Sequence, residues 1–277
     1  MPKLLPPDAK ARFERDGFYF PVRVMSAGEA RAYRDRLEAY ERASGGPIRS
    51  NMRHKVHLLF TWANALVRHR AVLDAVEDLI GPDILCWTTN FFIKEARDPA
   101  FVSWHQDATY WGLEPHDVVT AWVALSDAPV ASGAMKFLPG SHRRDLLAHV
   151  DTFHKDNLLT RGQEIAVTVD EREAVDVPLA AGEMSLHHVK LVHGSKPNTT
   201  DDRRIGLAIR YIPTYVRQTK VADSAMLVRG RDAHGHFAPE PEPVADLDDA
   251  ARAAHARVME KQIATYYSGT DVKVARA

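Results

Sequence analysis

The residues with the clearest capacity for chemistry are His105 and Asp107, which lie two residues apart in the segment SWHQDATYW. In an extended strand alternate side chains point to the same side, so we expect the imidazole and the carboxylate to converge while Gln106 points away. One more histidine from a distant strand would complete a facial triad of two histidines and one carboxylate. Such a triad leaves open coordination positions and is typical of Fe(II) sites that activate oxygen.

The elements that must position this pair are strands, and the sequence pattern changes from helical to strand-like at residue 84. From there on the chain has short apolar segments, several rich in β-branched and aromatic residues, separated by Pro, Gly, Asp and Ser. They read ILCWTTNFFIK, VVTAWVALS, GAMKFLP, GEMSLHHVKLV and RIGLAIRYI. Helices first and strands later indicate strands that pair mainly with one another. We predict a mainly β fold with flanking helices, built on a double-stranded β-helix (jelly roll, cupin-like) core.

The part of the chain before residue 84 has helical patterns. Ser26 and Glu29 have the spacing of a capping box, and apolar residues recur on one helical face behind them. A second helix is expected from about Leu66 to Ile80, where a Gly-Pro pair ends it.

The whole chain is expected to form one domain, 1–277, with its parts in a fixed order. N-terminal helices occupy 1–82, the β-helix core 84–215, and a C-terminal segment with a final helix at about 247–263 occupies 216–277. The polar stretch 143–174 is too long for a tight hairpin, and it is interpreted as a lid, a pocket wall or a surface excursion.

Composition excludes several classes of protein. The 277 residues carry 36 Lys and Arg against 37 Asp and Glu, which speaks against a nucleic-acid partner. The one cysteine, Cys86, lies in an apolar run, so a buried thiol is expected and an internal disulfide is impossible. Neither a signal-peptide pattern nor an apolar stretch long enough for a membrane span is found. We expect a cytoplasmic protein that does not bind membranes.

Four motifs in a fixed order carry a resemblance to a known family. They are WHQD, AWVAL, PGSH, and a block with Gly182-Glu183, HGS, Asn198 and Arg204. Their order and spacing, over roughly 84–213, resemble the phytanoyl-CoA dioxygenase family of Fe(II)- and 2-oxoglutarate-dependent oxygenases. The N-terminal segment FERDGFYFPVRV also looks like this family.

The resemblance implies a role for individual residues. His193, in HGS, resembles the remaining iron ligand beside His105 and Asp107. Arg204 resembles the arginine that holds the distal carboxylate of 2-oxoglutarate, a task that suits the rigid fork of a guanidinium. Further candidates for the cosubstrate pocket are Ser195, Trp122, Lys94 and Asn90.

The implied cofactors are Fe(II), 2-oxoglutarate and O2, and the implied reaction is hydroxylation of a C–H bond with release of succinate and CO2. Halogenases of the related group have a small residue in place of the carboxylate, so the presence of Asp107 favours hydroxylation, desaturation or ring formation. The substrate is expected to be a small polar metabolite. Two alternatives stay open: a cupin-like metal hydrolase or isomerase without 2-oxoglutarate, and a non-catalytic binding protein.

Other histidines near the motifs could compete for these roles. His187 and His188 precede the HGS triplet, and His188 is expected to line the pocket or to be structural. His142, in PGSH, is expected to be a turn histidine with a hydrogen bond.

The strand RIGLAIRYI raises a question about substrate charge. A period of two places Gly206, Ala208 and Arg210 on the face of Arg204. Arg210 then either presents a second positive charge to an anionic substrate, or leaves the barrel and pairs with an acidic side chain on the surface.

Overall fold

Two facing sheets form the core of the protein, whose structure is a computed structural model that describes residues 2–266. The larger sheet has seven strands in the order β1 (Phe18–Arg23), β10 (Glu183–His188), β5 (Val119–Ala124), β12 (Arg204–Pro213), β2 (Ile84–Lys94), β14 (Ser224–Arg229) and β15 (Ala238–Pro239). The smaller has four, in the order β3 (Val102–His105), β11 (His193–Ser195), β6 (Met135–Phe137) and β9 (Val175–Val177). All pairs in the two sheets are antiparallel except β14 with β15.

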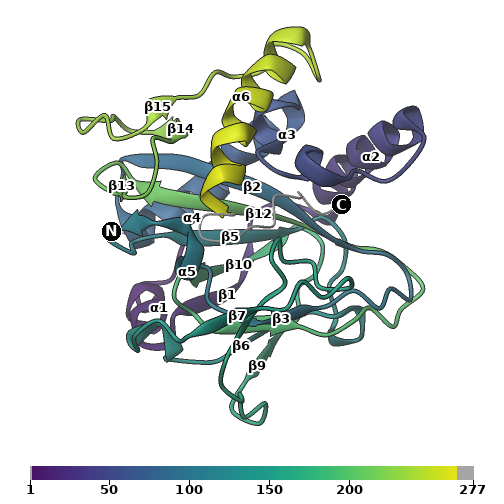
Figure 1. Cartoon of the computed structure of the whole chain (residues 1–277), viewed down its shortest axis with the longest axis vertical. Coiled ribbons are helices and arrows are strands. Elements are labelled where there is room, and N and C mark those ends of the chain that lie inside the picture. Colours follow the sequence, from purple (N-terminus) through teal and green to yellow (C-terminus); the bar gives the residue numbers. More distant parts are fainter. Residues whose placement is uncertain (1, 267–277) are drawn as a thin grey trace.

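Helices cover the outer side of the larger sheet (Figure 1). They include α2 (Ala27–Ser44), α3 (Thr61–Val67), α4 (Arg70–Ile80) and α6 (Asp249–Tyr266). Helix α1 (Ala9–Asp16) packs against β1 and α4, and α5 (Ala108–Trp111) contacts α6. The mainly β, cupin-like fold expected from the sequence is therefore confirmed. No helix within 2–266 has the length and apolar character needed to cross a membrane.

Alternation along β12 separates the apolar core from the interior between the sheets. Leu207 and Ile209 are fully buried in the apolar cluster that packs against the helices. Arg204 and Arg210 point the other way and line a pocket between the sheets. The expectation that these two arginines share one face is confirmed.

Two predicted boundaries are wrong. The helix expected from Leu66 to Ile80 is two helices, because His69 adopts an extended backbone (φ −58°, ψ 126°) between α3 and α4. The larger sheet also extends beyond 84–215, since β1 pairs with β10 and β14 pairs with β2. The capping box at Ser26 and the buried Cys86 are both confirmed.

The stretch 143–174 folds over the edge of the smaller sheet. It contains the strand pair β7 (His149–Asp151) and β8 (Gln163–Ile165). Asp151 accepts a hydrogen bond from the hydroxyl of Tyr110 (3.0 Å), which attaches the stretch to α5, and another from Nε of Arg161 (2.9 Å) within the stretch. Residues 158–161 of this stretch line a cavity beside Asp107, which argues against a plain surface excursion.

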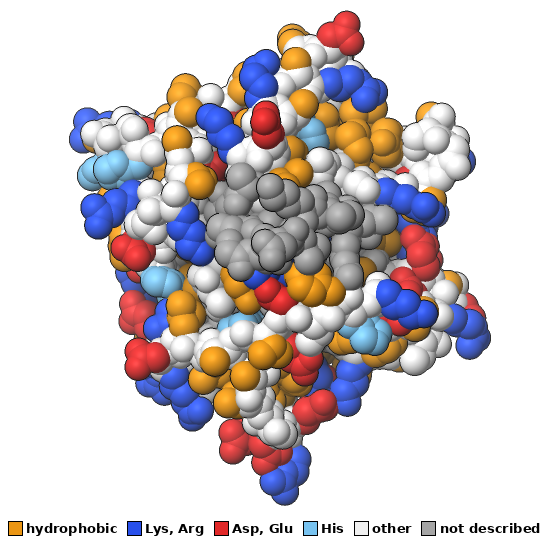
Figure 2. All heavy atoms as spheres, in the orientation of Figure 1, with side chains coloured by type: hydrophobic (Ala, Val, Ile, Leu, Met, Phe, Trp, Pro, Cys, Tyr) orange, Lys and Arg blue, Asp and Glu red, His pale blue; other side chains and the backbone are white. Residues whose placement is uncertain are grey.

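Acidic and basic side chains are interspersed over the face of the molecule in Figure 2, in keeping with the formal net charge of −1.

Candidate metal centre

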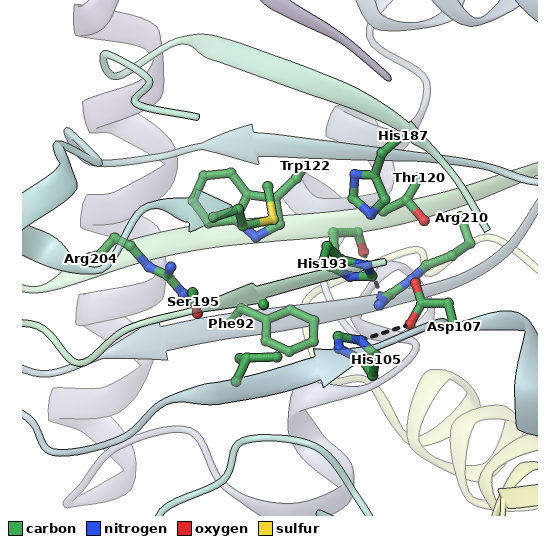
Figure 3. A pocket seen from close by; sticks show the side chains of 14 residues that line it. Phe92, His105, Asp107, Thr120, Trp122, His187, His193, Ser195, Arg204 and Arg210 are labelled. Atoms are coloured by element: carbon green, nitrogen blue, oxygen red, sulfur yellow. Dashed lines mark hydrogen bonds and ion pairs between the residues drawn. The ribbon is translucent and has the colours of Figure 1, made fainter. Parts of the chain in front are cut away.

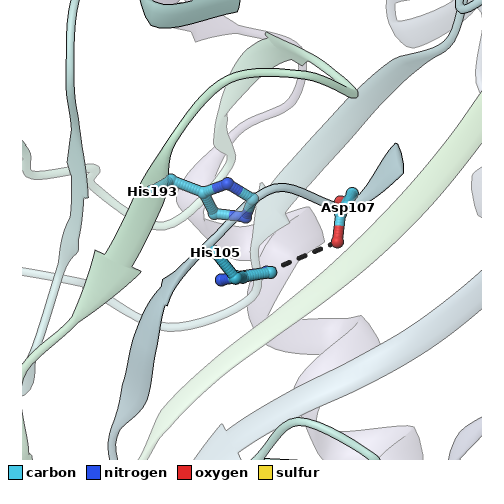
Figure 4. A group of neighbouring side chains, drawn as sticks. All are labelled: His105, Asp107 and His193. Atoms are coloured by element: carbon cyan, nitrogen blue, oxygen red, sulfur yellow. Dashed lines mark ion pairs between the residues drawn. The ribbon is translucent and has the colours of Figure 1, made fainter. Parts of the chain in front are cut away.

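His105 and His193 come together because their strands are neighbours. They are direct partners in the antiparallel pairing of β3 with β11, and their ring centroids lie 4.1 Å apart. Asp107 joins them, with Oδ1 3.4 Å from Nε2 of His105 (Figure 4). One potential ligand atom from each of the three residues lies within 4.8 Å of the others.

Asp107 reaches this position by a turn. Strand β3 ends at His105, and Asp107 has helical backbone angles (φ −59°, ψ −36°) at the residue before α5. The predicted convergence of the two side chains is confirmed, but the period of an extended strand does not produce it. Gln106 points away as expected, donating to the carbonyl of Lys190 (2.8 Å) and accepting from the amide of Leu147 (2.8 Å).

The hydrogen bonds of the two imidazole rings leave one nitrogen of each ring available to a metal ion. Nδ1 of His105 lies 2.9 Å from the carbonyl of Ser103, and Nδ1 of His193 lies 2.9 Å from the carbonyl of Leu191. A carbonyl only accepts, so each Nδ1 carries the proton and each Nε2 keeps a free lone pair for a ligand bond. Burial, with His105 as a second cause, lowers the pKa of His193 to about 4, so its ring is neutral near neutral pH.

Asp107 completes the fit. Its carboxylate is buried, and Oδ2 has no hydrogen-bond partner. A buried carboxylate oxygen without a partner is costly unless a cation binds it. Two free imidazole nitrogens and this oxygen match the ligand set of a 2-His-1-carboxylate site.

Arg204 lies at the far end of the same pocket, and Lys94 lies beside it, bonded to Ser195. Arg204 is 1% exposed, its Nε has no partner, and its one hydrogen bond goes to the carbonyl of Gly133. Burial lowers its pKa to about 10. Lys94 donates to the hydroxyl of Ser195 (2.7 Å), and burial together with Arg204 lowers its pKa to about 6. No carboxylate within 2–266 forms an ion pair with Arg204, so this end of the pocket lacks an anion.

Trp122 lies over this end of the pocket, and a glycine makes its position possible. The Arg204 guanidinium lies 5.2 Å from the Trp122 ring. A Cβ atom at Gly206 would lie 1.9 Å from Cζ2 of that ring. The room that Gly206 leaves is therefore filled by Trp122.

Replacing Gly206 with alanine is expected to displace the indole and to lower the free energy of unfolding by about 1–3 kcal/mol, the range for overpacking a core. Affinity for 2-oxoglutarate should fall with it, because the Trp122 ring no longer packs against Arg204. Denaturant unfolding and cosubstrate titration check both effects. Gly28→Ala in α2 is the control, since its nearest atom is 3.9 Å away. A Gly206→Ala protein with wild-type stability and affinity would contradict the packing described.

The neighbouring histidines divide between the two faces of β10. His187 lines the metal pocket, with its ring 4.9 Å from that of His193 and its Nδ1 without a partner. His188 lies on the opposite face, against Phe13 and His142, outside the pocket. It is structural, one of the two roles expected of it. His142 makes the expected hydrogen bond, from Nε2 to the carbonyl of Glu14 (3.1 Å). The alternation of β10 was the signal that could have singled out His187.

Asn90 and Arg210 lie at the other end of the site. Arg210 is 4% exposed and donates to Oδ1 of Asn90. Figure 3 shows Arg204 and Arg210 at opposite ends of the pocket, with His193 between them. The alternative in which Arg210 leaves the barrel and pairs with a surface acid is wrong. Asn90 lines an adjoining cavity with Arg210 and does not contact Arg204, whose neighbour on β2 is Lys94.

Known proteins resemble this chain in sequence and structure. The family model for phytanoyl-CoA dioxygenase matches residues 13–206. A probable alpha-ketoglutarate-dependent hypophosphite dioxygenase of Stutzerimonas stutzeri is 33% identical over 56% of this chain and 54% of its own length. The L-proline trans-4-hydroxylase of Streptomyces griseoviridis is 25% identical over 74% of this chain and 85% of its own length.

A solved structure extends the likeness to nearly the whole chain. The apo form of the non-haem monooxygenase ThoJ has 41% sequence identity and a TM-score of 0.83, and the match covers 92% of this chain and 96% of that one. A nickel complex of ThoJ matches with 38% identity and a TM-score of 0.77, over 92% of this chain and 97% of that one. The family model, these likenesses and the His-Asp-His cluster agree: the chain belongs to the phytanoyl-CoA dioxygenase family of non-haem oxygenases that use Fe(II) and 2-oxoglutarate.

Proposed function

We propose that His105, Asp107 and His193 hold the Fe(II) of a dioxygenase that hydroxylates a C–H bond of a small molecule. The observation that carries this is the convergence of two Nε2 lone pairs with a buried, unpartnered oxygen of Asp107. Bound iron supplies oxygen activation, in which 2-oxoglutarate and O2 yield succinate and CO2 and one oxygen atom enters the substrate.

Arg204 is proposed to bind the distal carboxylate of 2-oxoglutarate. Its fork lacks a carboxylate partner, and a bidentate pair with one would satisfy the buried Nε. Ser195 and Lys94 lie beside it and add donors, and Trp122 supplies an apolar wall. Asn90 is assigned to the adjoining cavity, where its contact is Arg210.

The two alternative functions lack support. A hydrolase or isomerase without 2-oxoglutarate would leave the buried guanidinium of Arg204 without a counter-ion in the pocket. A non-catalytic binding protein would not need the intact triad. We further propose that the chain acts as one domain, because β1 and β14 both belong to the larger sheet. A cytoplasmic location is also proposed; the buried, unpaired Cys86 agrees with it.

The names of three relatives include a small molecule: hypophosphite, L-proline or ectoine. A small molecule is therefore proposed as the substrate of this protein. Succinate formation, measured across a library of metabolites with Fe(II), 2-oxoglutarate and O2, tests the function. We expect succinate in the complete mixture, more of it with the substrate, and only background when any of the three is omitted. Conversion of a substrate without O2 and 2-oxoglutarate would contradict the proposal.

A further inference from the structure

Arg210 is a second buried arginine whose charge the cosubstrate site does not use. Its guanidinium donates to Oδ1 of Asn90 and to the carbonyl of Ala208 (3.4 Å), while Nε is buried without a partner. Within 2–266 it forms no ion pair with a carboxylate. The charge of Asp107 acts on it across the site, but that carboxylate is the proposed metal ligand. A buried guanidinium in this state favours an incoming anion.

Arg210 belongs to two cavities. It lines the metal pocket and also an adjoining cavity. Phe92 and Asp107 line both cavities as well, so the adjoining cavity lies directly beside the metal site. Arg204 lines the metal pocket but not the adjoining cavity.

Aromatic and aliphatic side chains form one part of the wall of the adjoining cavity, and polar side chains form the rest. Tyr110 and Trp111 come from α5, and Leu158 and Leu159 come from the stretch 143–174. The guanidinium of Arg210 lies 5.3 Å from the Trp111 ring and 5.6 Å from that of Phe92. Arg161 also lines this cavity but pairs with Asp151, so Arg210 is the lining arginine that forms no ion pair with a carboxylate of 2–266. One such cation beside aromatic and aliphatic side chains suits a ligand with one anionic group and an apolar part.

We propose that the adjoining cavity is the substrate site and that it takes a small molecule bearing a carboxylate or another oxyanion, which Arg210 binds. The proposal rests on the proposed function, because the cavity is a substrate site only if the triad holds iron. Two oxygens of the anion would accept from Nε and the fork of Arg210. Arg204 and Arg210 thereby divide their roles, one binding the cosubstrate and the other the substrate.

Asn90 is a positioning residue in this arrangement. Its Oδ1 holds the Arg210 fork, and its Nδ2 lies 3.1 Å from Nδ1 of His54. Asn90→Ala should weaken binding of the anion less than removal of the guanidinium does, since the charge stays in the cavity.

Matched pairs of acids and amides test the charge requirement. The protein, loaded with Fe(II) and 2-oxoglutarate without oxygen, is titrated by calorimetry with hexanoate and hexanamide, phenylacetate and phenylacetamide, and benzylphosphonate. At least one acid should bind wild type about tenfold more tightly than its amide. The phosphonate distinguishes a carboxylate site from one that accepts other oxyanions.

Variants then assign the preference to Arg210. Arg210→Gln should weaken acid binding by about thirtyfold or more, the effect of losing one side of a buried charged contact. Its affinity for 2-oxoglutarate should stay within about twofold of wild type, a difference of less than about 0.5 kcal/mol. Arg210→Lys, which keeps the charge, should retain part of the preference and serves if the glutamine variant does not fold. Exposed Arg217, as Arg217→Gln, is the control and should leave all affinities unchanged.

Three results would overturn the proposal: no acid favoured over its amide, an unchanged preference in both Arg210 variants, or a loss of 2-oxoglutarate affinity in place of acid affinity. The last would assign Arg210 to the cosubstrate. Failure of wild type to form the complex with Fe(II) and 2-oxoglutarate would instead count against the proposed function, so the two failures are distinguishable.

Discussion

Replacing His105, Asp107 or His193 with alanine is expected to abolish iron-dependent formation of succinate. Each variant loses one of three ligand atoms that lie within 4.8 Å of one another. Loss of an outer hydrogen-bond partner of a metal ligand already costs about 10–100-fold in metal affinity or activity, so loss of a ligand should cost more than about a hundredfold. The Fe(II) retained per protein after gel filtration and the rate of succinate formation are the two measurements.

The control for these variants is His188→Ala. His188 is adjacent to His187 in β10 but packs against Phe13 and His142, away from the metal pocket. Its removal should leave iron content unchanged. Circular dichroism should show an intact fold in all four proteins. Full iron content and turnover in any of the three ligand variants would remove that residue from the centre.

Arg204→Ala is expected to weaken binding of 2-oxoglutarate by about 2–5 kcal/mol, the cost of removing one partner of a buried charge pair. This corresponds to about thirtyfold or more in the dissociation constant. Arg204 is buried and has no carboxylate partner in the protein, so the cosubstrate would be its counter-ion. The affinity is measured without oxygen from the charge-transfer absorption of the complex with Fe(II).

Its neighbour provides a matched control. Arg203 points to the opposite side and pairs with Glu41 (2.7 Å) and Glu95 (2.7 Å). Arg203→Ala should therefore lower stability without changing affinity for 2-oxoglutarate. Arg204→Lys should recover only part of the affinity, because a lysine cannot present a planar fork. Equal cosubstrate affinities in Arg204→Ala and wild type would exclude Arg204 from the site.

The sequence by itself determined the residue types of the site and several relations within single segments. The H-x-D pair and the order of the motifs can be read directly from the residues. The shared face of Arg204 and Arg210 could be predicted because a strand alternates its side chains with a period of two. The capping box at Ser26 was predicted in the same way, from contacts within one turn of helix. These features depend on neighbours in the chain.

Only the tertiary structure decided what depends on segments far apart. Strand alternation predicts that Arg204 and Arg210 share a face, but it does not predict which face of the sheet points into the barrel. That Arg210 lies in the pocket depends on how β12 is placed between β5 and β2. The tertiary structure also decides that His187, and not His188, lines the metal pocket. The face of β10 that carries Met184, Leu186 and His188 packs away from the triad. Asp107 converges on His105 through a turn that begins α5, and the period of the strand ends before it. The physical reason is that burial and strand pairing are set by contacts between distant parts of the chain, which local periodicity does not encode.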